Sequence, residues 1–148
     1  MPNTKRNEIA VRELYKALNR QDLVGILDTI SDQIELVDFA AAKTLSGREA
    51  VEKYFQNWLT AFRDGTGEIS DLLAVGDHVV IEVRGRGTHT GIFHTLSGNL
   101  HPTGRTFEIN FCQVFRLKSG RIASMHSYYD ATPLMEALGL QIIGEKVA

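Results

Sequence analysis

Two polar residues interrupt hydrophobic faces of predicted strands, and their side chains could carry out proton-transfer chemistry. In the segment IELVDFAAA, Asp38 shares a strand face with Ile34 and Leu36, because side chains alternate along a strand. Gln113 interrupts an apolar face of the segment RTFEINFCQVFRL in the same way. A buried carboxylate or amide costs on the order of a few kcal/mol unless it is hydrogen-bonded. The pattern therefore predicts a pocket behind these two residues instead of a solid core.

An acid and an amide in one pocket are sufficient to move a proton beside a carbonyl group. An apolar pocket disfavours the charged form of a carboxylate and so makes it a stronger base. We therefore predict Asp38 as a catalytic base and Gln113 as a hydrogen-bond donor to the developing enolate oxygen. Two alternatives stay open: Asp38 could cap the N–H groups of a turn, and Gln113 could satisfy backbone groups at a β-bulge.

The elements that must position these residues begin with helices. Helical periodicity covers residues 5–19, 23–30 and 47–62, and Asp22 is the expected cap of the second helix. The third helix carries an apolar face made of Val51, Phe55, Trp58 and Phe62. The three aromatic residues are candidates for the pocket wall, although such a stripe is more commonly part of a packed core.

Strands dominate the rest of the chain. They are predicted at residues 68–75, 78–90, 105–117 and 121–130, and they are followed by a short helix at 132–140 with Thr132 as its cap and a tail, 141–148, that adds a strand or frays. The strand 105–117 adds Phe107 and Phe111 to the candidate wall. Helices followed by antiparallel strands indicate an α+β fold in a single domain, 1–148.

No signature of a metal or cofactor site occurs in the chain. HxH and HExxH spacings do not join four of the five histidines, His89, His94, His101 and His126. Cys112, the single cysteine, is predicted to face away from the pocket and cannot form an intrachain disulfide. GxSxG, a phosphate-binding glycine loop and a Rossmann fingerprint are also missing. We expect no metal and no cofactor.

Composition excludes several classes of partner. The formal net charge is −2, whereas a nucleic-acid-binding face is normally strongly basic. The N-terminal residues are polar, and no apolar run approaches the roughly 18 residues that a spanning helix needs. We therefore expect a cytoplasmic protein whose partner is a small apolar molecule, with no nucleic acid and no membrane.

The chain resembles the SnoaL-like polyketide cyclase and ketosteroid isomerase branches of the NTF2-like superfamily. The motifs that carry the resemblance are LYKALNRQDLVGILDTI, LSGREAVEKYFQNWLTAF, RGTHTG, HPTGRTFEINFCQVFRL and SGRIASMHSYYDATPLMEALGL. The resemblance implies a cone, in which a strongly curved antiparallel sheet wraps around three N-terminal helices and a deep apolar pocket, with a short C-terminal helix. It also implies a homodimer that pairs through the convex sheet face, here Glu108, Asn110, Cys112, Val114 and Arg116.

The family's functional positions are only partly kept. Asp38 corresponds to the base of the ketosteroid isomerases, and Gln113 to the second residue of their oxyanion hole. Leu14 stands at the oxyanion-hole tyrosine, and Tyr15 lies about 100° further round the helix. The acid/base aspartate and the assisting histidine of the cyclases correspond to Ser127 and Gln113.

These observations leave three functions open. The chain could be a cofactor-free isomerase or cyclase that binds an apolar carbonyl compound, with Tyr15, Ser127, His89 and Tyr129 shaping the pocket or orienting the ligand. It could bind such a molecule without catalysis, or it could fill its cavity with its own aromatic side chains. An Asp38 capped by backbone N–H groups and directed away from the cavity would favour binding, and a cavity too small for a ring would favour the third function.

Overall fold

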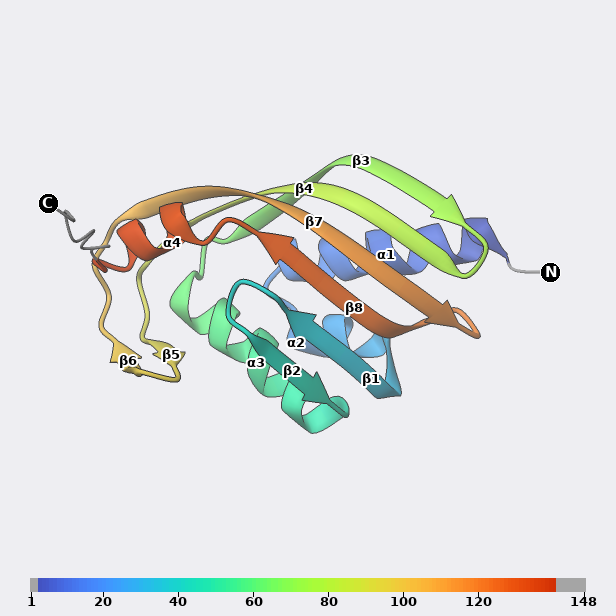
Figure 1. Cartoon of the computed structure of the whole chain (residues 1–148), viewed down its shortest axis with the longest axis horizontal. Coiled ribbons are helices and arrows are strands. Elements are labelled where there is room, and N and C mark those ends of the chain that lie inside the picture. Colours follow the sequence, from blue (N-terminus) through green and yellow to red (C-terminus); the bar gives the residue numbers. More distant parts are fainter. Residues whose placement is uncertain (1–2, 141–148) are drawn as a thin grey trace, which may run out of the picture.

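Three helices lie against the concave face of a curved sheet (Figure 1). The computed structural model describes residues 3–140. The helices are α1 (Thr4–Asn19), α2 (Leu23–Asp28), α3 (Arg48–Ala61) and α4 (Thr132–Ala137). The strands are β1 (Ile30–Asp38), β2 (Lys43–Ser46), β3 (Thr66–Val75), β4 (His78–Thr88), β5 (Phe93–Thr95), β6 (Gly98–Leu100), β7 (Thr106–Lys118) and β8 (Arg121–Tyr129). The predicted α+β architecture, with three helices before the long strands and a short helix after them, is confirmed.

The main sheet has the strand order β2-β1-β8-β7-β4-β3. Its pairs are antiparallel except for β1 and β8, which run parallel. Two neighbouring strands that are far apart in sequence can pair in parallel, since no tight hairpin has to join them. β5 and β6 form a separate hairpin within the connection from β4 to β7.

Apolar faces of the helices and the sheet form the core between them. Val11 and Leu14 of α1 and Phe55 of α3 pack with Ile81 and Phe115 of the sheet. Complete burial of such a side chain contributes about 1.5–3 kcal/mol. The predicted face of β7 is confirmed, because its apolar residues and Gln113 are buried or half-buried while alternate residues are exposed or half-exposed.

The ends of the elements follow local capping chemistry. Asp22 caps α2 as predicted, since its Oδ1 accepts the Gly25 N–H at 2.9 Å. The predicted cap Thr132 is wrong, because it is the first residue of α4 and its own N–H is bound by Asp130 Oδ1 at 2.9 Å. The predicted tail 141–148 lies outside the described residues.

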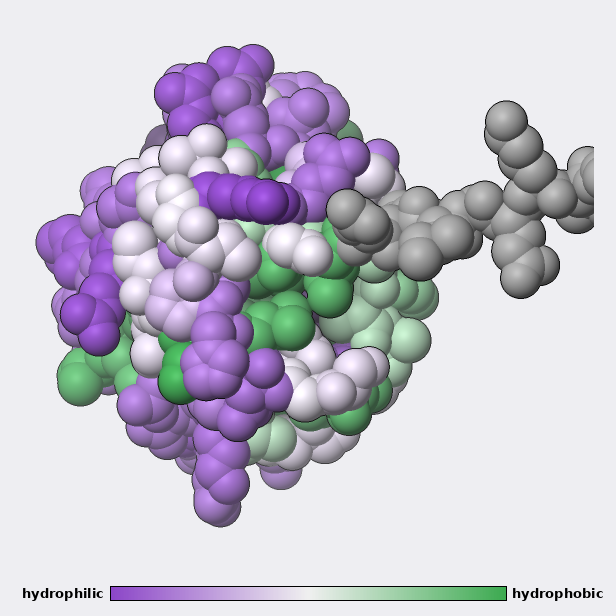
Figure 2. Space-filling model, turned by 90° about the vertical axis from the view of Figure 1, so that its left-hand side faces the viewer, coloured by the Kyte–Doolittle hydropathy of each residue, from purple (hydrophilic) through white to green (hydrophobic). Residues whose placement is uncertain are grey.

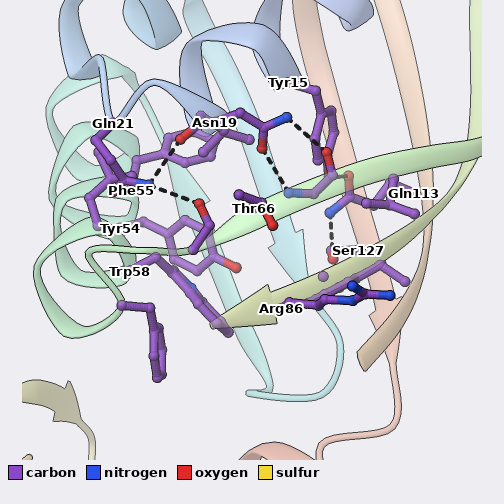
Figure 3. Close-up of a pocket in the computed structure, with 18 of the residues that line it drawn as sticks. Tyr15, Asn19, Gln21, Tyr54, Phe55, Trp58, Thr66, Arg86, Gln113 and Ser127 are labelled. Carbon is purple, nitrogen blue, oxygen red and sulfur yellow. Dashed lines mark hydrogen bonds between the residues drawn. The ribbon is translucent and has the colours of Figure 1, made fainter. Parts of the chain in front are cut away.

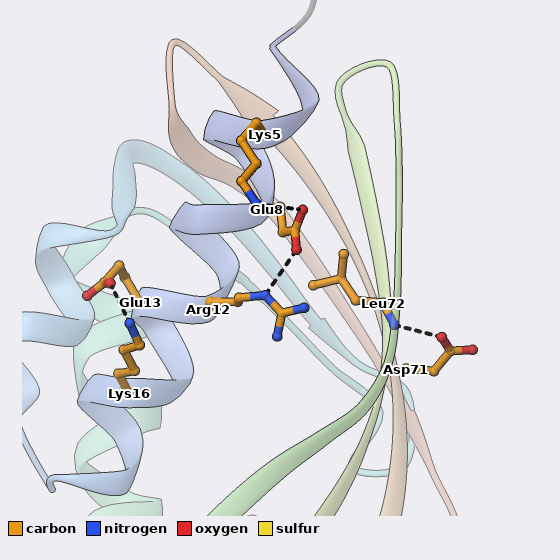
Figure 4. A network of polar contacts seen from close by, with 7 residues as sticks. All are labelled: Lys5, Glu8, Arg12, Glu13, Lys16, Asp71 and Leu72. Atoms are coloured by element: carbon orange, nitrogen blue, oxygen red, sulfur yellow. Dashed lines mark hydrogen bonds and ion pairs between the residues drawn. The ribbon is translucent and has the colours of Figure 1, made fainter.

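The outer face of α1 carries ion pairs that neutralise its charged side chains (Figure 4). Glu8 accepts from Arg12 at 3.1 Å, and Glu13 accepts from Lys16 at 3.2 Å. Exposed pairs of this kind contribute roughly 0.3–0.5 kcal/mol each. Among the helices of residues 3–140, none is long and apolar enough to cross a membrane.

Candidate functional site

A pocket of about 130 Å³ lies between α1, α3 and the concave face of the sheet. Figure 2 shows hydrophobic side chains in a hollow at one end of the molecule, framed by polar residues. The wall includes eight residues predicted from the sequence: Tyr15, Phe55, Trp58, Phe62, Phe107, Phe111, Gln113 and Ser127. The aromatic stripe of α3 therefore belongs partly to the core and partly to the pocket.

A chain of hydrogen bonds runs along one side of the pocket (Figure 3). The Tyr15 hydroxyl donates to Gln113 Oε1, and Gln113 Nε2 donates to Ser127 Oγ at 3.1 Å. Gln113 is 5% exposed and Ser127 is 1% exposed. The register positions these two side chains, because Gln113 and Ser127 are opposite each other on β7 and β8. Gln113 therefore binds side chains, and the β-bulge between β7 and β8 lies elsewhere, at Arg116 and Leu117.

Burial keeps the Tyr15 hydroxyl protonated. Desolvation raises the pKa of Tyr15 far above its ordinary value, although its hydrogen bond to Gln113 acts in the opposite direction. Tyr15 therefore remains a donor to Gln113. Among the described residues, no hydrogen bond uses the hydroxyl proton of Ser127 or a second amide proton of Gln113. These two protons are available to a molecule in the pocket.

Asp38 belongs to a second polar cluster, at the end of β1. Its Oδ2 accepts from the hydroxyls of Tyr54 at 2.7 Å and Tyr129 at 2.9 Å, and its Oδ1 accepts from the Ala41 N–H at 3.0 Å. The side chain is almost completely buried, with 1% of its surface exposed. Asp38 is the neighbour of Ser127 across the parallel pair β1–β8, so the two clusters are adjacent.

The two tyrosines of this cluster are neutral donors. Desolvation, followed by the nearby charge of Asp38, raises the pKa of both Tyr54 and Tyr129 far above the ordinary value. Tyr54 lines the pocket, whereas Asp38 and Tyr129 do not. Asp38 therefore reaches the pocket only through the Tyr54 hydroxyl, and it also caps the turn that follows β1, which is the alternative left open by the sequence.

His89 is also outside the pocket wall. It is completely buried and packs against Phe62, with ring centroids 5.7 Å apart. Its Nδ1 accepts from the Thr103 N–H at 3.2 Å, and Nε2 has no hydrogen-bond partner among the described residues. Desolvation lowers the pKa of His89, while the backbones of Gly91 and Leu100 act in the opposite direction. A neutral His89 holds the connection between β4 and β7 in place through its hydrogen bond with Thr103.

Sequence reasoning missed Tyr54. It lies three residues after Val51 and four residues before Trp58, so it borders the same helix face. A tyrosine with a buried ring finds a partner for its polar hydroxyl, and here the partner is Asp38. Within residues 3–140, no group of three or more histidine, cysteine, aspartate or glutamate side chains is arranged to hold a metal ion.

The chain belongs to the SnoaL-like polyketide cyclase family, whose model matches residues 8–138. Its fold is the NTF2-like cone, in agreement with the solved structures that it resembles. No curated protein matches the chain.

Three of the similar structures are informative about the fold. AclR from Streptomyces galilaeus, a proposed hydroxylase, is 25% identical with a TM-score of 0.80, and the match covers 98% of this chain and 88% of that chain. A proposed SnoaL-like polyketide cyclase from Jannaschia is 18% identical with a TM-score of 0.80, covering 93% and 94%. IdmH from Streptomyces antibioticus, a proposed polyketide cyclase, is 24% identical with a TM-score of 0.73, covering 90% and 99%.

Proposed function

We propose that the protein binds a small, largely apolar molecule that carries a carbonyl group, and that the carbonyl oxygen faces Gln113 and Ser127. The observation that carries this proposal is the pair of unused donor protons on these two side chains, in a pocket whose wall is otherwise mainly aromatic and aliphatic. A carbonyl oxygen accepts such protons, whereas a hydrocarbon would leave them unsatisfied. The similarity to proposed polyketide cyclases is consistent with a carbonyl-bearing ligand.

The size of the pocket supports a ring-sized ligand. A dry engineered cavity of about 150 Å³ binds benzene, and the pocket here measures about 130 Å³. Because the pocket opens to the surface, a larger molecule could leave part of itself outside. This size argues against a cavity filled by the protein's own aromatic side chains, which was the third function left open by the sequence.

A binding comparison between two probes of similar shape tests the proposal. Acetophenone has the carbonyl group, and ethylbenzene does not. Trp58 is the single tryptophan and lines the pocket, so its indole N–H resonance reports binding in an NMR titration of the full chain. We expect acetophenone to bind more tightly, and Gln113→Leu to reduce that preference by about threefold to tenfold. Thr66→Val at the pocket rim is the matched control and should keep the preference. Equal binding of the two probes to the natural protein would contradict the carbonyl site.

A second candidate function is cofactor-free proton transfer, and the contact between Tyr54 and Asp38 favours it. A proton taken from a bound molecule by the Tyr54 oxygen could be balanced by transfer of the Tyr54 proton to Asp38, over the existing 2.7 Å hydrogen bond. Gln113 would stabilise the developing enolate oxygen. If Asp38 is the base, Asp38→Asn lowers turnover at least about a hundredfold in an active preparation. Unchanged turnover would remove Asp38 from the mechanism and leave binding as the function.

The convex sheet face is the proposed dimer interface. It carries the predicted set Glu108, Asn110, Cys112, Val114 and Arg116, which alternates with the buried face of β7. At its edge, the rings of Phe39 and Tyr128 stack at a centroid distance of 4.3 Å although both are exposed. Exposed aromatic side chains next to polar ones are typical of a protein interface.

A further inference from the structure

The polar atoms of the pocket differ in what they can offer a ligand. Gln113 and Ser127 have donor protons to spare, as described above. On the opposite wall, α3 contributes the hydroxyl of Tyr54, which points into the pocket in Figure 3. Tyrosine has one hydroxyl proton, and that of Tyr54 is given to Asp38. The Tyr54 oxygen can therefore only accept a hydrogen bond from a ligand.

Asp38 fixes the direction of the hydrogen bond that the Tyr54 hydroxyl makes. A carboxylate can only accept, and it receives three hydrogen bonds: from Tyr54, Tyr129 and the Ala41 N–H. Burial and the charge of Asp38 together raise the pKa of Tyr54 far above its ordinary value, so the hydroxyl keeps its proton. The hydroxyl cannot turn round to donate to a ligand without leaving a buried carboxylate short of a partner.

Polar groups at the rim differ in whether they could take this role. Asn19 is tied to Gly67 by two hydrogen bonds of 2.9 and 2.7 Å, and Arg86 lies 3.7 Å from Glu108 on the outer face. Gln21 donates to the carbonyl of Gly65 at 2.9 Å, but its Oε1 is buried without a hydrogen-bond partner among the described residues, so it is a second acceptor at the rim. Tyr15 retains an oxygen lone pair, but its hydroxyl is bonded to Gln113, on the side of the pocket where the donors lie.

We propose that the pocket selects a hydroxy ketone: a ligand whose carbonyl oxygen accepts from Gln113 or Ser127 while a hydroxyl a few bonds away donates to Tyr54. This inference rests on the proposed function. It adds an acceptor on the protein, the Tyr54 oxygen, to the donors of Gln113 and Ser127. An apolar group placed against Tyr54 supplies no hydrogen bond to that oxygen, and a second carbonyl group there meets the lone pairs of an acceptor. Tyr54 is thus a specificity-determining residue, held in its role by Asp38.

Five single-ring probes test this polarity by the same Trp58 titration. Acetophenone carries the carbonyl alone, whereas the 3- and 4-hydroxyacetophenones add a hydroxyl, and the 3- and 4-methylacetophenones put a methyl of similar volume in its place. We expect the better hydroxy isomer to bind about threefold to tenfold more tightly than its methyl counterpart, despite the greater hydrophobicity of the methyl group. The comparison uses the natural chain, so it does not depend on whether a variant folds.

Variants then test whether Tyr54 is the residue that causes the preference for a hydroxyl over a methyl group. Tyr54→Phe should abolish or reverse the hydroxyl-over-methyl ratio while acetophenone still binds. Tyr129→Phe is the matched control, because it removes a hydrogen bond to the same Asp38 oxygen from a residue outside the pocket wall, and it should keep the ratio. A ratio at or below one in the natural chain would overturn the inference, as would a ratio kept in Tyr54→Phe but lost in Tyr15→Phe or in Gln21→Met. If no probe binds at all, the proposed function itself fails, which is a distinguishable result.

Discussion

The Tyr54 hydroxyl lies 2.7 Å from Asp38 Oδ2 and donates to it, so a helix residue that lines the pocket is joined to a buried carboxylate at the end of a strand. The contact separates the roles of the two residues. Tyr54 faces a ligand, whereas Asp38 stays behind it and sets the direction of its hydrogen bond. This arrangement explains how a carboxylate can lie on an apolar strand face without lining the cavity itself.

Replacing Asp38 by asparagine should destabilise the fold. The asparagine amide group offers one acceptor oxygen and two protons, so it cannot accept from two tyrosines and the Ala41 N–H as the carboxylate does. At least one buried donor then loses its partner, at a cost of roughly 1–3 kcal/mol. Urea denaturation measures the loss. Asp64→Asn is the matched control. Asp64 accepts two hydrogen bonds from Thr88, but its side chain is exposed to water. Equal stability of Asp38→Asn and the natural chain would contradict the described cluster.

Alkaline pH should unfold the protein cooperatively. The folded state raises the pKa values of Tyr15, Tyr54 and Tyr129, chiefly by burial, whereas tyrosines of the unfolded chain ionise near pH 10. The stabilisation is therefore complete below about pH 10 and is lost as the pH rises further. Tyrosinate absorbance should increase together with the loss of near-ultraviolet circular dichroism, and Tyr54→Phe should make the melting temperature less sensitive to alkali. Ionisation of Tyr15, Tyr54 and Tyr129 in a fully folded protein would disprove the burial of these three side chains.

Gly91→Ala should weaken the attachment of the β5–β6 hairpin. A Cβ atom at this position would lie 2.0 Å from the backbone carbonyl oxygen of Thr60, and the Gly91 N–H binds the Ala61 carbonyl at 3.1 Å. Because backbone atoms cannot move aside as a side chain can, the expected cost is about 1–3 kcal/mol. Ile92→Ala, at the partly exposed neighbouring position, is the control for losing a side chain nearby. An unchanged melting temperature in Gly91→Ala would show that the hairpin does not sit against the end of α3 in this way.

A charge on the convex face should separate the proposed dimer. Val114 lies between Val80 and His126 on neighbouring strands, in the middle of the outer surface of the sheet. We expect the natural protein to have about twice the chain mass of 16.5 kDa by light scattering, and Val114→Lys to have the mass of one chain. Leu96→Lys, at a hairpin position that is 84% exposed, should keep the dimer. A natural protein that is a monomer at all concentrations would exclude the convex-face dimer.

The sequence was informative wherever alternation or helical periodicity applied. Alternation along β7 predicted one shared face for Gln113, Phe107 and Phe111, and that face is the inner one. The stripe on α3 included Trp58, which lines the pocket. Periodicity says which face a residue occupies but not which neighbour is in front of it. Asp38 was therefore placed on the correct side, but Tyr54 lies between it and the cavity.

Local sequence patterns could not predict contacts between segments that are far apart in the chain. β2 is four residues long, and the hairpin strands β5 and β6 are three residues each, which is too short to show alternation. The parallel pairing of β1 with β8 joins residues about 90 apart in the chain, such as Asp38 and Ser127. Only the register of that pair brings the Asp38 cluster next to Gln113.

A crystal structure of the protein with acetophenone would show directly whether the carbonyl group lies at Gln113 and Ser127. We expect the ring among the aromatic side chains of the pocket, with its oxygen within hydrogen-bond distance of Ser127 Oγ or Gln113 Nε2. A ring bound instead in the open groove outside α3, which is lined by Lys43, Lys53 and His94, would contradict it, as would a carbonyl turned away from Gln113 and Ser127.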